Sequence, residues 1–123
     1  MRFRPGKAAL ERTRWTLVEL GGLPVEPSEG GRDPHLVLDP DGRRLSGSGG
    51  CNRLLGRYEL DGDRLGFGAV ATTMMACPEP LMRRERAFID ALEATTGFRI
   101  AGETLALLAG DEVVARLGAG DPE

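Results

Sequence analysis

The sequence predicts a small α+β domain in which a curved antiparallel sheet packs around one helix. The 123 residues allow a single domain with a single hydrophobic core. The 18 glycines indicate short strands joined by tight turns, because glycine accepts the positive φ angles that such turns need. The order along the chain is strands, one segment of helical period and strands again, which favours an antiparallel sheet over a parallel one.

Extended segments account for most of the chain. Residues 13–20 are apolar on both faces of an alternating pattern, which is typical of a well-buried strand. The turn signals Asp39-Pro40-Asp41-Gly42 and Asp61-Gly62-Asp63 each join two short strands into a hairpin. The stretch 24–34, which is rich in prolines and acids, indicates an exposed loop. The expected strands are 13–20, 35–38, 43–48, 55–60, 64–67, 71–77, 98–101, 104–108 and 113–117.

One segment after Pro78 has the periodicity of an amphipathic helix. Pro80 suits its first turn, and Gly97 is expected to end it. The apolar positions at helical spacing are Leu81, Met82, Phe88, Ile89 and Leu92. The expected organisation is therefore an N-terminal arm over 1–12, one domain over 13–117 and a loose C-terminal tail over 118–123.

Composition excludes several classes of protein. The net charge of −3 argues against a protein that works by neutralising nucleic-acid phosphates. No stretch approaches the roughly 20 apolar residues of a membrane-spanning helix. The first ten residues lack the apolar region of a secretory signal, so the chain as given indicates a cytoplasmic protein, or one of the cell envelope if an export segment precedes it. We expect a monomer.

Few residues are candidates for catalysis or metal binding. His35 is the only histidine, and a structural or surface role is favoured for it. The run Gly47-Ser48-Gly49-Gly50 looks like a phosphate cradle, but a strand follows it where a phosphate loop would have a long helix, so a structural turn is favoured. Two cysteines and one histidine are too few for a typical zinc site. Glu79 and Glu85 are expected to be surface or capping groups, and no cofactor is expected.

The segment that ends at Cys77 raises two questions about side-chain placement. A disulfide between Cys51 and Cys77 would stabilise the fold by about 3 kcal/mol. The alternative is two buried, reduced cysteines, which the absence of a signal segment favours, and the sequence leaves both states open. Because adjacent strand residues face opposite sides, one of Met74 and Met75 is expected to fill the core and the other to be partly exposed.

Several short segments combine into one pattern over residues 15–117. Its two most specific parts are Gly49-Gly50-Cys51-Asn52-Arg53 and Thr73-Met74-Met75-Ala76-Cys77, in this order and spacing. Together they resemble the META domain (HslJ-like) family. The resemblance implies an α+β fold with a strongly curved or barrel-like antiparallel sheet and one main amphipathic helix. The residues that match the family signature are Trp15, Gly50, Asn52, Gly56, Tyr58, Thr73, Ala76, Glu85 and Phe88.

The same resemblance implies a role in heat-shock or antibiotic stress, or in the cell envelope, where many relatives are lipoproteins. It implies no enzymatic mechanism, so no catalytic, cofactor-binding or metal-binding residue carries over. We therefore expect a non-catalytic protein that acts through contact with an unknown protein partner. The alternative is a carrier of a small apolar ligand inside the curved sheet. The chain departs from the family at Met74, where relatives usually place Arg or Lys, and in lacking the signal sequence and lipidated cysteine of many bacterial members.

Overall fold

The computed structural model describes residues 9–25 and 33–120 as one α+β domain. Residues 26–32 of the expected loop, and the ends at 1–8 and 121–123, lie outside the described residues. The elements are β1 (Trp15–Leu20), β2 (Leu23–Pro24), β3 (His35–Asp39), β4 (Arg44–Ser48), β5 (Arg53–Asp61), β6 (Arg64–Phe67), β7 (Ala71–Thr72), α1 (Glu79–Ala94), β8 (Gly97–Ala101), β9 (Thr104–Ala109) and β10 (Glu112–Ala119).

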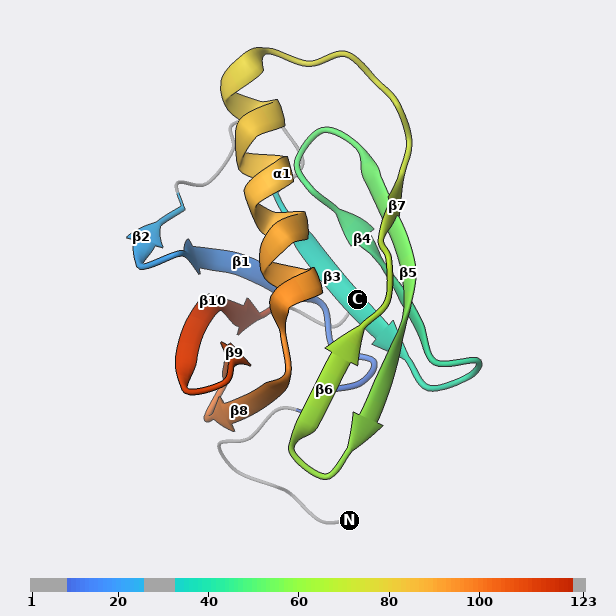
Figure 1. Ribbon diagram of the computed structural model, residues 1–123, viewed down its shortest axis with the longest axis vertical. Helices are drawn as coiled ribbons and strands as arrows, with labels where there is room; N and C mark the ends of the chain where they lie inside the picture. The colour runs from blue at the N-terminus through green and yellow to red at the C-terminus, as the bar shows by residue number, and fades with distance from the viewer. Residues whose placement is uncertain (1–8, 26–32, 121–123) are drawn as a thin grey trace.

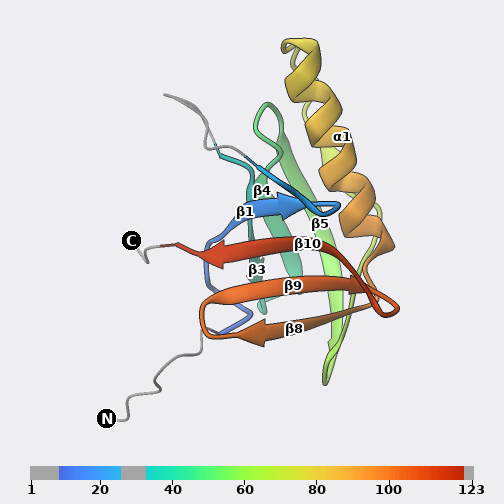
Figure 2. The same cartoon turned by 90° about the vertical axis from the view of Figure 1, so that its left-hand side faces the viewer.

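The strands form one antiparallel sheet that curves round into a ring (Figure 1, Figure 2). The order along the ring is β1-β3-β4-β5-β6-β8-β9-β10, and β10 pairs with β1 to close it. The short strands β2 and β7 pair with β1 and β5. The ring is not a regular barrel, because β6 and β8 share only one register pair, Arg64 with Gly97.

The core lies inside this ring and is built from alternate residues of the strands. β1 buries Trp15 and Leu17, and β3 buries Leu36 and Leu38. This alternation follows from the strand geometry, in which successive side chains point to opposite faces. The expectation that β1 is buried on both faces is wrong, because Val18 on its outer face is 45% exposed.

The interior of the ring is filled by large side chains of the protein itself. The largest fully buried side chains are Trp15, Tyr58, Phe88, Leu36, Leu38, Leu45, Leu54, Leu65, Leu92, Leu105, Leu107 and Leu117. They form one continuous hydrophobic cluster. The space that an apolar ligand inside the sheet would need is thus occupied by these residues.

The helix α1 lies across one side of the ring and packs on β6, β1 and β10 (Figure 1, Figure 2). Phe88 and Leu92 on its inner face are fully buried, as expected. Met82 lies outside the apolar stripe and is 44% exposed, contrary to expectation. The helix ends at Ala94, whereas Gly97, the expected end, begins β8.

Both ends of the domain extend further than expected. β10 continues through Gly118 and Ala119, which pair with β1, so these residues are not part of a loose tail. At the other end Leu10 is buried in the core, and the backbone N–H of Arg12 donates to the carbonyl oxygen of Leu38. Residues 9–12 therefore belong to the packed domain.

The expected strand 71–77 is only two residues long. β7 covers Ala71–Thr72 and pairs with β5, and the chain that follows to Pro78 is irregular. The backbone carbonyl of Arg53 and the side chain of Asn52 accept its hydrogen bonds, as described below. The local pattern of threonine and methionine suits a strand, but hydrogen bonds to residues distant in the sequence determine the conformation of this segment.

Candidate functional site

The Gly-rich turn between β4 and β5 is closed by its own hydrogen bonds. The backbone N–H of Gly49 donates to the carbonyl oxygen of Asn52 at 2.9 Å. The N–H of Gly50 donates to Oγ of Ser48 at 3.0 Å. Gly50 has a φ of 105°, which residues other than glycine rarely adopt. Because a phosphate cradle would offer such N–H groups to the anion, this arrangement supports a structural turn.

The carboxylate of Glu85 on α1 is buried beneath this turn. The residue is only 6% exposed. Its Oε2 accepts the backbone N–H of Asn52 at 2.6 Å, and its Oε1 accepts Nδ2 of Asn52 at 2.8 Å. Hydrogen bonds to a charged group contribute about 1.5–3 kcal/mol each. This pair of bonds therefore fastens the middle of α1 to the turn.

The expectation that Glu85 is a surface or capping group is wrong. Glu85 lies three residues before Phe88 and four before Ile89, so all three share the inner face of the helix. The helical periodicity contains this signal, because it places an acidic residue in the apolar stripe. Glu79 is exposed, as expected, and forms an ion pair with Arg83 at 3.0 Å.

Gly49 provides the space that Glu85 occupies. A Cβ atom at Gly49 would overlap Cγ of Glu85 and lie 2.8 Å from its Cδ. Real Cβ atoms essentially never come this close to another heavy atom. Gly49 is thus needed for its lack of a side chain, independently of its backbone angles.

Asn52 also holds the irregular segment before α1. Its Oδ1 accepts Oγ1 of Thr73 at 2.9 Å and the backbone N–H of Met75 at 2.7 Å. Oγ1 of Thr73 in turn accepts the backbone N–H of Arg53 at 3.1 Å. Since Asn52 donates to Glu85 with its nitrogen and accepts from this segment with its oxygen, an amide is required at this position. An aspartate there would set two carboxylates against each other.

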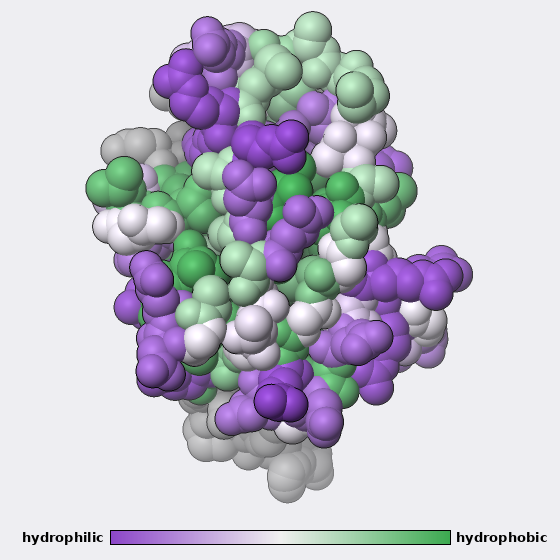
Figure 3. All heavy atoms as spheres, in the orientation of Figure 1, coloured by the Kyte–Doolittle hydropathy of each residue, from purple (hydrophilic) through white to green (hydrophobic). Residues whose placement is uncertain are grey.

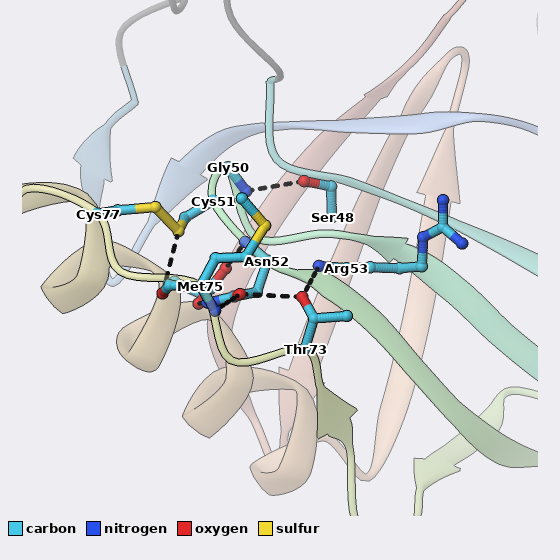
Figure 4. The surroundings of a disulfide bond; sticks show 9 residues. Ser48, Gly50, Cys51, Asn52, Arg53, Thr73, Met75 and Cys77 are labelled. Atoms are coloured by element: carbon cyan, nitrogen blue, oxygen red, sulfur yellow. Dashed lines mark hydrogen bonds between the residues drawn. A yellow bond between two sulfur atoms is a disulfide. The ribbon is translucent and has the colours of Figure 1, made fainter.

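A disulfide bond between Cys51 and Cys77 lies beside these hydrogen bonds (Figure 4). It closes a loop of 26 residues and ties the turn to the segment just before α1. The Sγ of Cys51 also lies 3.8 Å from the carbonyl oxygen of Met75. The two signature segments are therefore in direct contact through the disulfide and through Asn52. Of the signature residues, Gly50, Asn52, Thr73 and Glu85 meet here, and the exposed Ala76 lies in the same segment, next to Cys77.

The methionines of this segment point away from the core. Met74 is 91% exposed and Met75 is 52% exposed. The expectation that one of them fills the core is wrong, because the segment is not a strand and its residues do not alternate between two faces. Asn52 fixes the backbone, and the side chains stay on the surface.

The remaining signature residues lie elsewhere and serve the fold. Trp15 and Phe88 are fully buried, and Nε1 of Trp15 donates to the carbonyl oxygen of Leu10 at 2.9 Å. Gly56 lies within β5 and is half-buried. No interaction groups these residues into one site with Asn52, to judge from the contacts of residues 9–25 and 33–120.

Tyr58, the last signature residue, forms a separate cluster. Its buried hydroxyl donates to the carboxylate of Glu11, and the guanidinium of Arg43 lies 5.9 Å from the centre of its ring. Burial, followed by the bond to Glu11, raises the pKa of Tyr58 well above its usual range. Tyr58 therefore stays protonated and acts as a fixed donor. Glu11 was not identified from the sequence, because residues 1–12 lack periodicity.

His35 lies between a backbone carbonyl and a guanidinium. Its Nδ1 lies 3.1 Å from the carbonyl oxygen of Asp33 and 3.4 Å from Nη2 of Arg14. A single tautomer satisfies only one of these, because Nδ1 must donate to the carbonyl but accept from the guanidinium. Burial lowers the pKa of His35, so the neutral ring is favoured. Cys51, the other candidate for chemistry, is bound in the disulfide.

Neither a metal site nor a membrane-spanning helix is found in the part of the chain that the structure describes. There, no three His, Cys, Asp or Glu side chains come together in a way that could hold a metal ion. No helix in residues 9–25 or 33–120 has the length and apolar character needed to span a membrane.

Comparison with known proteins identifies the family. A model of the META domain matches residues 8–121, which is nearly the whole chain. The chain belongs to the META domain family. The resemblance carried by the two signature segments is thus confirmed. No match was found among the curated proteins.

Two solved structures share the META fold of this chain. The NMR structure of a protein from Burkholderia xenovorans is 27% identical, with a TM-score of 0.71, and the match covers 90% of this chain and 83% of that one. A second NMR structure is 23% identical, with a TM-score of 0.66 and 89% of each chain covered. The second likeness concerns the fold alone.

Proposed function

We propose that this META domain is a non-catalytic protein that acts by contact with another protein, in the cell envelope and in response to stress. The observation that carries the proposal is the exposure of Met74 and Met75 on a segment fixed by Asn52 and the disulfide. Figure 3 shows a pale green patch at the top of the molecule, over the loop that leads into α1.

Exposed methionines suit a surface for protein contact. The methionine side chain is flexible and polarisable, so it adapts to the shape of a partner. Contiguous apolar patches on a protein surface often mark interaction sites. The segment is already tied to the turn by a hydrogen bond to the N–H of Met75 and by the disulfide at Cys77. Little backbone entropy would therefore be lost when a partner binds.

The disulfide supports placement in the envelope. Disulfides form and persist in oxidising compartments and are rare in the cytosol. The bond between Cys51 and Cys77 joins the two signature segments directly. A non-catalytic role is supported by the surroundings of His35, which contacts a backbone carbonyl and a guanidinium.

The test replaces Met74 with a photo-crosslinking residue in the source organism. After heat or envelope stress, irradiation should join the domain to one discrete protein. The control carries the same residue in place of Val18, which is also exposed but lies on β1. Equal crosslinking from both positions, or none from position 74, would refute contact through this segment.

A second test concerns stress and localisation. A deletion strain should grow less well under heat or envelope stress, and wild-type protein should restore growth better than a Met74→Ser, Met75→Ser variant. A Val18→Ser variant should restore growth fully, because both sites are exposed and these changes alter stability little. Normal growth of the deletion strain would contradict the stress role, and recovery of the protein from the cytosol alone would contradict the envelope placement.

A further inference from the structure

A groove runs along α1, between the helix, the β1–β2 hairpin and the start of β10. Its volume of about 720 Å³ lies within the range of roughly 300–1,000 Å³ of known ligand sites. In Figure 3, green surface lies on this side of the molecule, at the level of β2 and beside α1. The groove is outside the ring and distinct from the methionine segment.

The helix provides a wall of small side chains. Ala87, Ala91 and Ala94 line the groove and are spaced by four and three residues, so they share one face of α1. The facing wall is aliphatic and includes Leu23, which is 70% exposed, and Val113. Because alanines do not fill the space between the walls, an apolar channel stays open along the helix. Covering this surface would be favourable through the hydrophobic effect.

Arg84 lines the same groove and has unused donors. Its Nε and Nη2 atoms are buried and have no hydrogen-bond partner. Such unsatisfied polar groups are rare and costly in native structures, and they call for a partner. When the side chain turns toward the groove, the planar guanidinium offers Nε and Nη2 as a fork that matches the two oxygens of a carboxylate. The unpaired charge therefore indicates an anionic group at this end of the groove.

The acids of the groove lie away from Arg84. Asp90 is six residues further along α1, a rise of about 9 Å along the helix axis. Glu112 lies at the start of β10, beside the C-terminal end of the helix (Figure 2). Both side chains are exposed, and their negative charges would repel the anionic group of a ligand placed beside them. The groove is thus positive at the Arg84 end, and its negative charges lie further along, at the exposed Asp90 beside Ala91 and at Glu112.

We propose that this groove binds an aliphatic chain that ends in a carboxylate. The carboxylate pairs with Arg84, and the chain lies along Ala87, Ala91 and Ala94. The helix rises about 15 Å between Arg84 and Ala94, which suits a fatty acid of medium length. This site does not depend on the protein contact proposed for the methionine segment.

The test compares three probes with the same ten-carbon chain: decanoate, decanol and decyltrimethylammonium. Each is titrated into ¹⁵N-labelled protein below its micelle concentration, and amide shifts are followed. Decanoate should bind most tightly and shift the signals of Ala87, Ala91 and Val113. The Arg84→Gln variant should bind decanoate at least roughly tenfold more weakly, since a hydrogen bond to a charged group is worth more than about 1.4 kcal/mol, while its affinity for decanol stays unchanged.

Two further variants serve as controls. Arg83→Gln removes a neighbouring charge that is exposed and paired with Glu79, and it should bind decanoate like the wild type. Ala87→Leu narrows the groove at an exposed position and should weaken binding of every probe without changing the far-UV spectrum. The proposal is overturned if head-group charge or Arg84→Gln has no effect on affinity, or if decanoate shifts only signals outside the groove. It is also overturned if the groove signals change with protein concentration alone, which would make a second copy the occupant.

Discussion

Replacing Gly49 with alanine would put a methyl group where the side chain of Glu85 lies. The added Cβ would overlap Cγ of Glu85, so one of the two residues must move. The φ of Gly49 is not in the left-handed region, so alanine can adopt the local backbone. The effect of Gly49→Ala therefore measures the contact with Glu85 and not a change in backbone preference.

The expected loss of stability follows from the bonds that break. Moving Glu85 aside removes its two hydrogen bonds to Asn52. Bonds to a charged group contribute about 1.5–3 kcal/mol each, and both depend on the same carboxylate, so we expect a total loss of about 3–5 kcal/mol. The Glu85→Ala variant breaks the same bonds and should lose a similar amount.

Urea unfolding of the four proteins in a double-mutant cycle tests this reasoning. In the Glu85→Ala background the carboxylate is already gone, so Gly49→Ala should cost less than about 1 kcal/mol more. The matched control is Gly68→Ala, because a Cβ there meets nothing within 4 Å, and it should alter stability by less than about 1 kcal/mol. If the losses at 49 and 85 simply add, the contact with Glu85 is not what requires glycine at position 49.

Two further predictions concern the disulfide and His35. Replacing Cys51 and Cys77 with alanine should lower the free energy of unfolding by about 3 kcal/mol, because a loop of 26 residues is released in the unfolded state; unchanged urea unfolding, or two reactive thiols in the denatured, unreduced wild type, would contradict the bond. Burial lowers the pKa of His35 in the folded state, so on acidification the unfolded state takes up the His35 proton at a higher pH than the folded state does. The free energy of unfolding therefore decreases as the pH falls below about 6.5, the ordinary pKa of histidine. Wild-type stability should fall more steeply than that of His35→Gln on acidification, and parallel profiles would refute this.

Local signals were sufficient to predict most of the sheet. The turn signal at 39–42 encodes its own backbone conformation, and Gly42 has the positive φ that such turns require. The β3–β4 and β5–β6 hairpins therefore lie within one or two residues of their expected positions. Trp15 and Phe88 were placed correctly because alternation and helical period depend only on neighbouring residues.

The candidate site could be predicted only in part, because its contacts are long-range. The motifs indicate Asn52 and Cys77, but no local pattern indicates that the amide of Asn52 accepts hydrogen bonds from Thr73 and Met75 where the pairing with β5 ends. Glu85 is different, since its helical phase already places it on the inner face. Arg84 comes immediately before Glu85, and its lack of a hydrogen-bond partner depends on the surrounding walls of the groove, which the sequence does not specify.

The ties at the Gly-rich turn do not act independently. The disulfide and the hydrogen bonds of Asn52 close the same loop, so its conformational entropy is lost only once. With the disulfide formed, Asn52 meets Thr73 and Met75 at a high effective concentration. Reduction of the disulfide should thus weaken these hydrogen bonds as well as remove a covalent bond. The fixed display of Met74 and Met75 is therefore a property of the oxidised protein, which links the proposed contact surface to an oxidising compartment.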